Sequence, residues 1–298
     1  MFVSDEQANV VRIIDGPTGR IEGRIATGGR PRGMAVSPDG STLYVAEGQT
    51  GQIAAIDLRT HRIIRQYDSG PDPERFVVSP DGKRLYIANE DHSAVSFLDL
   101  ASGRITNEVT VGPEPEGMAV SPDGATVIAT SETASTTHFI DAATGKLVDS
   151  VMVGSRPRDA LFLKQGKELW VTSELRGLID VFDPVTHKII HRIDLVKQLP
   201  DIDPVQSVEL AVTRDGSRVF VALGRGNHVA EIDPATYMVV RTFPVGFRNW
   251  GIALSPDEHR LYAVAGLSGD MTVIDLVHNT VERKVKLGGM PWGVEAVP

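Results

Sequence analysis

Arginines, carboxylates and two tryptophans recur at one position of a repeated segment, where they would form a polar and aromatic binding pocket. Seven related tetrapeptides carry them: Arg30-Pro31-Arg32-Gly33, Asp72-Pro73-Glu74-Arg75, Glu114-Pro115-Glu116-Gly117, Arg156-Pro157-Arg158-Asp159, Gln206-Ser207-Val208-Glu209, Arg248-Asn249-Trp250-Gly251 and Met290-Pro291-Trp292-Gly293. Because the repeats are nearly identical elsewhere, this variety is informative. The candidate ligand-binding residues are Arg32, Glu74, Arg75, Glu116, Arg158, Asp159, Glu209, Trp250 and Trp292.

A second group of polar residues follows a different strand of each repeat and offers ligands for a metal ion. Its members are Glu47, Asn89, Glu90, Glu132, Glu174, His92 and His228. Oxygen ligands suit Ca²⁺, and added imidazole suits Zn²⁺ or iron. A dense ligand motif such as His-Glu-x-x-His is missing from the sequence. Since turns favour Asp and Asn for backbone reasons, ordinary solvated turn residues remain the alternative interpretation.

These groups sit within an internal repeat, which decides the fold class. The turn Ser37-Pro38-Asp39-Gly40 returns in the following units, and its proline column ends at Pro298. A second column is an aspartate that follows an apolar residue. It has seven members, spaced by 42 residues except for one step of 50: Asp15, Asp57, Asp99, Asp141, Asp183, Asp233 and Asp275.

Each unit contains four short apolar runs, which we interpret as β-strands. In the second unit they are 33–36, 43–46, 53–57 and 63–67. The runs are apolar on both faces, as expected for sheets packed between neighbouring sheets. Four strands in about 40 residues, repeated seven times, predict an all-β, seven-bladed β-propeller formed by a single domain, residues 1–298.

The chain starts and ends partway through a repeat, and the strand that is missing at the N-terminus is present at the C-terminus. Phe2 aligns with Tyr44, so the chain starts in a second strand, whereas residues 292–297 align with a first strand. We therefore expect the C-terminal strand to complete the blade begun by residues 2–27, which leaves no open sheet edge. If the first strand is innermost, both groups of polar residues share one face of the ring.

Eight extra residues lengthen one connection and fall within residues 195–204. Loops carry function more readily than scaffold does. We interpret this segment as a lid or partner contact over the axial mouth, with a neutral insertion as the alternative.

Composition excludes several classes of protein. The 298 residues carry a formal charge of −9, and Lys and Arg are scattered singly, which argues against a nucleic-acid-binding face. No apolar run is long enough for a transmembrane helix. The sequence holds no cysteine, so disulfides and thiolate chemistry are excluded. The N-terminus lacks a signal core, which leaves a cytosolic protein or one whose export signal was trimmed.

Two resemblances refine this interpretation. The unit with residues 85–89, 95–99 and 109–112 resembles the YVTN family of β-propeller repeats, which implies the fold but no activity. The segments 2–6, 30–33, 221–224, 249–250, 255–258 and 291–294 are similar to propeller proteins associated with pyrroloquinoline-quinone (PQQ)-dependent catabolism. That resemblance implies a periplasmic protein with a quinoprotein alcohol dehydrogenase or cytochrome c as partner, and it supplies no catalytic residues.

Three functions follow as hypotheses. The first is a non-catalytic propeller that binds a small molecule or a redox protein partner and is accessory to PQQ-dependent alcohol oxidation. The alternative is a metal-dependent lactonase or esterase, with Ca²⁺ or Zn²⁺ held by the glutamates above, or by Glu209, together with Asn89 or a histidine. A third is haem binding through His92 or His228.

Overall fold

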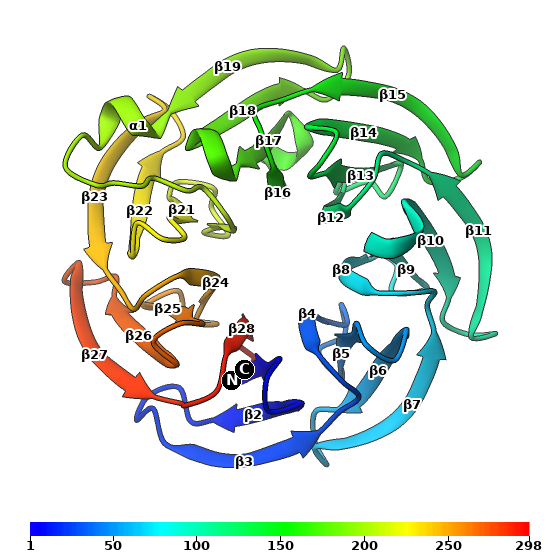
Figure 1. The fold of residues 1–298 in the computed structure, drawn as a ribbon, viewed down its shortest axis with the longest axis horizontal. Helices are drawn as coiled ribbons and strands as arrows, with labels where there is room; N and C mark the ends of the chain where they lie inside the picture. Colours follow the sequence, from blue (N-terminus) through cyan, green and yellow to red (C-terminus); the bar gives the residue numbers. More distant parts are fainter. Residues whose placement is uncertain (298) are drawn as a thin grey trace.

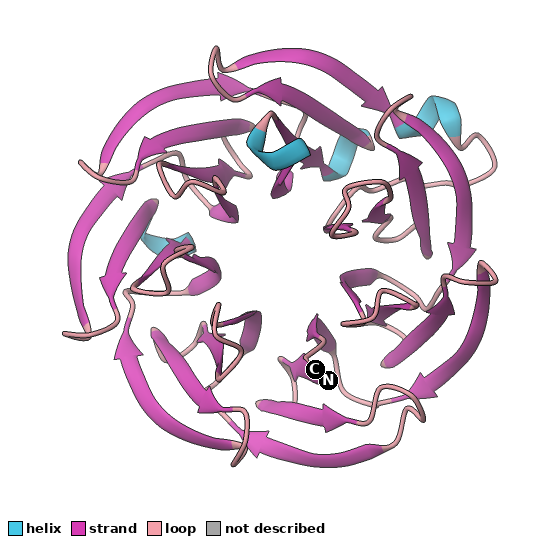
Figure 2. Ribbon diagram, turned by 180° about the vertical axis from the view of Figure 1, so that it is seen from behind, coloured by secondary structure: helices cyan, strands magenta, loops and turns pink. Residues whose placement is uncertain are grey.

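The strands form a ring of seven four-stranded antiparallel sheets, as the repeat predicts (Figure 1). The computed structural model describes residues 1–297, and Pro298, the last member of the proline column, lies outside the described residues. We number the sheets as blades 1 to 7 in chain order. Seen from behind, the ring contains only short helical turns between its strands (Figure 2). None of the helices in residues 1–297 is long and apolar enough to cross a membrane.

The blades have the following strands, from the axis outward. Blade 1 comprises β28 (Pro291–Glu295), β1 (Phe2–Asp5), β2 (Val10–Ile14) and β3 (Ile21–Ala26), and blade 2 comprises β4 (Pro31–Val36), β5 (Thr42–Glu47), β6 (Gln52–Asp57) and β7 (Arg62–Asp68). Blade 3 comprises β8 (Pro73–Val78), β9 (Arg84–Asn89), β10 (Ala94–Asp99) and β11 (Arg104–Thr110), and blade 4 comprises β12 (Pro115–Val120), β13 (Thr126–Ser131), β14 (Thr136–Asp141) and β15 (Lys146–Met152).

The remaining blades follow the same order. Blade 5 comprises β16 (Pro157–Leu163), β17 (Glu168–Ser173), β18 (Leu178–Asp183) and β19 (Lys188–Asp194), and blade 6 comprises β20 (Leu210–Val212), β21 (Val219–Ala222), β22 (His228–Asp233) and β23 (Met238–Pro244). Blade 7 comprises β24 (Asn249–Leu254), β25 (Arg260–Ala265), β26 (Asp270–Asp275) and β27 (Thr280–Lys286). The helical turns are Glu90–His92, Lys164–Gly166, Glu174–Arg176 and α1 (Leu195–Gln198).

The repeated polar residues hold the turns between strands. In blade 2, the Ser37 hydroxyl donates to Asp39 at 2.5 Å and accepts from the Thr42 amide at 3.0 Å, while Gly40 takes a φ of +71°. The aspartate column closes a different turn, because Asp57 accepts the amides of residues 59 and 60 at 3.1 and 2.6 Å. Both columns therefore recur for local structural reasons.

The core lies between neighbouring blades. One aromatic column packs in these seams, and its members, all at most 7% exposed, are Phe2, Tyr44, Tyr86, Trp170, Phe220 and Tyr262. Around Tyr44 cluster Phe76, Leu85 and Leu98 of the next blade. Burial of these apolar faces is the main favourable term that holds one blade against the next.

Strand pairing between the two ends closes the ring, as the phase of the repeat predicts. Phe2 pairs with Glu295 and Val3 with Val294 in the antiparallel β1–β28 ladder. The two termini accordingly lie side by side at the inner end of blade 1 (Figure 1).

The insertion does not form the lid over the mouth that the sequence suggested. It begins with α1 at the outer edge of the ring between blades 5 and 6 (Figure 1). Leu195 and Val205 are buried there against apolar side chains of both blades. The Gln198 side-chain oxygen also accepts a hydrogen bond from the Val239 amide of β23 at 2.7 Å. Apolar residues within and directly after the extra segment therefore draw it into the seam between two blades.

Candidate functional site

Two sets of loops meet on one face of the ring, which we call the top face. One loop precedes the inner strand of each blade, and the other joins its second and third strands. In six blades a backbone hydrogen bond of 2.9 to 3.2 Å joins them, as between the Glu174 amide and the Arg156 carbonyl. The residue after the second strand is thereby placed beside the residue that precedes the inner strand.

The residue that precedes the inner strand has an uncommon backbone conformation. Its φ is +48° to +61° in five blades, at Arg30, Asp72, Glu114, Arg156 and Arg248. Non-glycine residues seldom occupy this region, and such strain is frequent at functional sites.

These loops surround a cavity of about 400 Å³ on the axis, which we call the upper cavity. Its wall consists of acids, arginines, two tryptophans and one methionine: Glu6, Arg30, Arg32, Asp72, Glu74, Glu90, Asp91, Glu116, Glu132, Arg156, Arg158, Arg248, Trp250, Met290 and Trp292. A wider hollow of about 720 Å³ over blades 1 to 3 adjoins it and shares four of these residues. The volume suits a small ligand.

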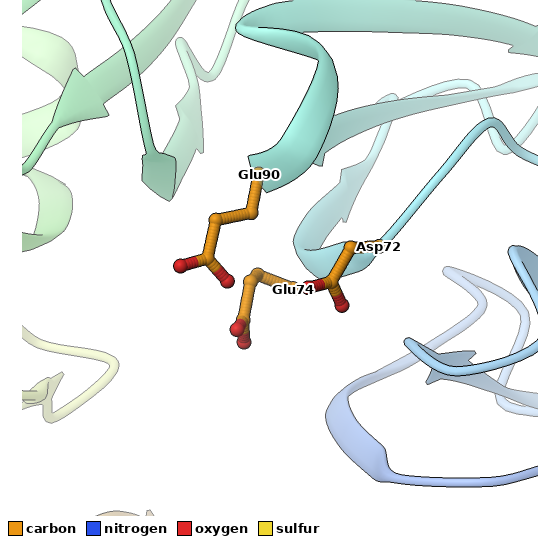
Figure 3. Close-up of side chains that lie close together, drawn as sticks. All are labelled: Asp72, Glu74 and Glu90. Carbon is orange, nitrogen blue, oxygen red and sulfur yellow. The ribbon is translucent and has the colours of Figure 1, made fainter.

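On the wall formed by blades 2 and 3, three carboxylates surround one guanidinium. The carboxylates of Asp72, Glu74 and Glu90 point toward one another, with oxygens within 4.8 Å (Figure 3). Arg30 lies 2.9 Å from Asp72, 2.9 Å from Glu74 and 3.5 Å from Glu90. Arg32 also pairs with Glu74 and contacts Glu6 at 2.8 Å.

The pKa values of Glu74 and Glu90 shift in opposite directions. Their hydrogen bond, together with burial, raises the pKa of Glu90 to about 8. Burial opposes ionisation of Glu74, but its hydrogen bonds with Arg32 and Glu90 outweigh this and lower its pKa to about 2. At neutral pH Glu90 is therefore protonated and Glu74 is ionised.

On the wall formed by blades 4 and 5, the ion pairs are more deeply buried. The Arg158 side chain is 6% exposed, pairs with Glu132 and contacts Glu116 at 2.7 Å. Arg156, at the rim, lies 2.6 Å from Glu132 and 3.4 Å from Glu174.

The two tryptophans complete the wall and carry arginines on their faces. Their rings stack with centroids 6.5 Å apart. Arg158 and Arg248 lie 4.7 and 4.4 Å from the Trp250 centroid, and Arg75 lies 4.9 Å from that of Trp292. These cation–π contacts hold the guanidiniums in place.

Below lies a second cavity of about 270 Å³, the lower cavity, which also has Trp292 in its wall. Arg75 reaches across the axis to Glu209 at 2.7 Å and Asp159 at 3.6 Å. Burial raises the pKa of Asp159, and the charge of Arg75 offsets this only in part. Burial, followed by the negative charge of Glu209, raises the pKa of Glu295 to about 8.

All nine residues predicted to bind a ligand lie around the axis. Six line the upper cavity, Arg75, Asp159 and Glu209 line the lower one, and Trp292 lines both. Their role in binding stays a prediction.

The metal candidates divide into two groups. Glu90 and Glu132 line the upper cavity, and Glu174 contacts its arginines. Glu47 and Asn89 instead hold loops of the scaffold: Glu47 accepts the Gly28 amide at 2.8 Å, and Asn89 donates to the Ser69 carbonyl at 2.9 Å.

The two candidate histidines also lie apart from the axis. His228 contacts the Gly226 carbonyl at 2.7 Å. His92 lies in the turn Glu90–His92, and neither side chain is in the wall of the upper or the lower cavity. The convergence of Asn89 or a histidine with the axial glutamates, which the hydrolase hypothesis required, is not observed, and the histidines proposed as haem ligands are not at the axis.

Several wall residues were not among the candidates, although a sequence signal existed for them. Arg30, Asp72, Arg156 and Arg248 each precede the candidate column by two positions in the same tetrapeptides. Their positive φ is what brings them to the mouth, and periodicity alone does not reveal a backbone angle.

Comparison with known proteins gives a family and a fold. The family model described as the Choice-of-anchor I domain matches residues 90–267, more than half of the chain. No curated protein matches the sequence.

Solved structures show the same architecture at low sequence identity. Hydrazine synthase of Kuenenia stuttgartiensis has a TM-score of 0.81 at 22% identity, covering 92% of this chain and 91% of that one. A functionally unknown protein from Desulfotomaculum acetoxidans has a TM-score of 0.80 at 16% identity, covering 99% of both chains. The dihydro-heme d1 dehydrogenase NirN, in complex with DHE, has a TM-score of 0.72 at 16% identity, covering 98% and 74%.

Proposed function

The chain belongs to the Choice-of-anchor I domain family, and from this premise we propose that it is a non-catalytic propeller whose axial mouth binds a small molecule or a redox protein partner. The observation that carries the proposal is the wall of the upper cavity. Six of its seven carboxylates lie within 4 Å of an arginine, which leaves Asp91 as the acid outside these pairs. Such a wall presents fixed charges for recognition.

We further propose that this binding serves PQQ-dependent alcohol oxidation in the periplasm, with a quinoprotein dehydrogenase or a cytochrome c as the partner. The support is the resemblance of segments 2–6, 30–33 and 291–294 to propellers associated with that metabolism. One structure that shares the fold is named a dihydro-heme d1 dehydrogenase.

Charge reversal on the mouth tests the partner. Asp91 is exposed and lines the upper cavity, so Asp91→Lys should weaken binding to a quinoprotein alcohol dehydrogenase or its cytochrome c, measured by calorimetry at low salt. The matched control is Glu22→Lys, on the exposed outer strand β3. Equal affinities of the native chain and of both variants would show that the mouth is not the contact.

The alternative function, a metal-dependent lactonase or esterase, has one observation in its favour. Asp72, Glu74 and Glu90 offer an all-oxygen donor set that suits Ca²⁺ better than Zn²⁺. Arg30, however, already contacts all three carboxylates, so a metal ion would have to displace its guanidinium.

Calcium titration of the native chain and of Glu74→Gln separates the two functions. The alternative requires Ca²⁺ binding by the native chain that Glu74→Gln abolishes, together with lactone or ester hydrolysis that a chelator removes. Native binding without hydrolysis, or no binding, leaves the non-catalytic function in place.

A further inference from the structure

Arg248 differs from the other arginines of the upper cavity because it has no carboxylate partner. Arg30, Arg32, Arg156 and Arg158 each lie within 4 Å of at least one acid. Among residues 1–297, no acidic side chain lies within that distance of Arg248. Its guanidinium instead stacks on Trp250 at 4.4 Å and lines the cavity.

The repeat register explains why the partner is missing. The position after the second strand is glutamate in blades 1, 3, 4 and 5 and glycine in blades 2, 6 and 7: Glu6, Gly48, Glu90, Glu132, Glu174, Gly224 and Gly266. In blade 5 the hydrogen bond between the Glu174 amide and the Arg156 carbonyl places Glu174 beside Arg156. In blade 7 the same bond, at 3.1 Å, places Gly266 beside Arg248.

The neighbouring blade adds a second unpaired cation. Gly224 stands where blades 3 to 5 have glutamate, and it is followed by Arg225, which is exposed and has no acid within 4 Å among the described residues. Burial lowers the pKa of Arg248, and the positive charge of Arg225 is the next cause. An arginine remains protonated at neutral pH. The side of the mouth at blades 6 and 7 therefore carries two arginines that form no ion pair within residues 1–297.

The N–H donors of the Arg248 guanidinium have no partner within residues 1–297. Its Cζ lies over the Trp250 ring, and its side-chain nitrogens make no hydrogen bond or ion pair there. A carboxylate or a phosphate matches two of these donors at once. Gly266, which lacks a side chain, places no competing carboxylate beside Arg248.

We propose that Arg248, supported by Arg225, binds the anionic group of the ligand, a carboxylate or a phosphate, at the blade 7 wall of the upper cavity. This inference rests on the proposed binding role of the mouth and names the chemistry of its ligand. The acids on the opposite wall, above all the unpaired Asp91, place the ligand's anionic end at blade 7 rather than at blade 3.

A variant in which the protein itself supplies a carboxylate to Arg248 tests the inference. Gly266→Glu adds the side chain that blades 1, 3, 4 and 5 have at this position, and it should occupy Arg248 in place of the ligand. A Cβ at position 266 would lie 3.3 Å from Trp250 Cδ1 and 3.4 Å from the Pro291 carbonyl, so Gly266→Ala is the matched steric control.

The probes are succinate and inorganic phosphate, titrated at low ionic strength and followed by calorimetry and by the Nε–H resonances of the arginines. The native chain and Gly266→Ala should bind at least one probe. Gly266→Glu and Arg248→Gln should bind it at least about tenfold more weakly, as expected for the loss of a charge-assisted pair. Arg225→Gln, at an exposed side chain, should weaken binding less. The preferred probe distinguishes a carboxylate ligand from a phosphate ligand.

Failure of this inference is distinguishable from failure of the proposed function. If no probe binds, or if Arg248→Gln and Gly266→Glu bind the probes as the native chain does, the anion site at Arg248 is wrong. The Asp91→Lys test still reports on the mouth in that case, because its readout is a protein partner rather than an anion.

Discussion

The protonated carboxyl of Glu90 is the residue-scale feature with the clearest consequence for pH. Glu90 and Glu74 lie on one wall with Asp72, and Arg30 and Arg32 supply the nearby positive charge. Arg32 also pairs with Glu6, so two cations face four carboxyl groups, and holding one proton on Glu90 is the lower-energy arrangement. The mouth therefore gains negative charge when this proton leaves.

The pH dependence of stability should reveal this proton. The folded pKa of Glu90 is about 8, above its ordinary value of 4.5. The folded state binds the proton more tightly, so the stabilisation is complete below pH 4.5 and is lost as pH rises to 8. Glu90→Gln, which cannot ionise, should lose less stability between pH 5 and 8 than the native chain, as measured by the thermal midpoint.

The control for this measurement is Glu114→Gln, on the same rim, where Glu114 accepts a hydrogen bond from Thr133. It should keep the native pH profile. Some decline should persist in Glu90→Gln, because the raised pKa of Glu295 contributes over the same range. Identical profiles for the native chain and Glu90→Gln would contradict the raised pKa of Glu90.

At the scale of the inner strands, one equivalent position near the start of the strand holds glycine in four blades and a charged residue in the other three. Its members are Gly33, Arg75, Gly117, Asp159, Glu209, Gly251 and Gly293. The glycines allow close approach of neighbouring strands, since a Cβ on Gly33 would lie 2.7 Å from the Glu74 carbonyl. The three charged side chains fill the axis and form the floor of the mouth.

Removal of the cation from this floor should be costly. Arg75→Met leaves Asp159 and Glu209 without their counter-charge, and we expect a loss of about 3 kcal/mol in the free energy of unfolding. Denaturant titration at pH 7 measures it. The loss should shrink as the pH falls, because burial raises the pKa of Asp159 and that carboxylate is then protonated, and Glu209→Gln in the same chain should restore part of it. Arg20→Met, in an exposed pair with Glu22, should change little.

The same scale shows what the sequence could and could not predict. Strand positions, blade number and the axial column followed from periodicity, because each repeat places equivalent residues at equivalent points of the ring. Asn89 and Glu90 were grouped as one set of ligands, yet adjacent residues at a strand end point to opposite sides. Asn89 therefore holds a loop while Glu90 faces the axis.

The insertion failed as a lid for a related reason. Its length was visible in the sequence, but its direction depends on where Leu195 and Val205 find apolar partners, and those partners are in the seam. Arg30 and Asp72 reach the mouth because their φ is positive. Glycine is the usual residue at a positive φ, so nothing in the sequence indicated that an arginine and an aspartate would adopt this conformation.

At the scale of the whole molecule, blade 1 is linked covalently to both neighbours. β28 follows blade 7 and β3 precedes blade 2, so opening the ring requires separation of the backbone-bonded strands β1 and β28. Every seam between two blades is held by side-chain packing and by one connecting loop, because the chain begins and ends inside a blade. The split blade therefore leaves no seam that packing alone holds.

Circular permutation can separate the contribution of the β1–β28 strand pairing from that of the packing between blades. The ends lie side by side, so a short linker can join them (Figure 1). New ends between Gly28 and Gly29 make blade 1 continuous, so that packing alone closes the ring. New ends between Thr133 and Ala134 fall inside blade 4 and split it between the two ends, as blade 1 is split in the native chain. Both permutants should keep the native circular dichroism spectrum.

They should differ in how readily the ring opens. The permutant opened at residue 28 should unfold faster, and its amides at the seam between blades 1 and 2 should exchange earlier, because the ring can part there without breaking strand pairs. The permutant opened at residue 133 should unfold at nearly the native rate. Equal unfolding rates in the two permutants would mean that packing between blades, rather than the β1–β28 ladder, limits opening of the ring.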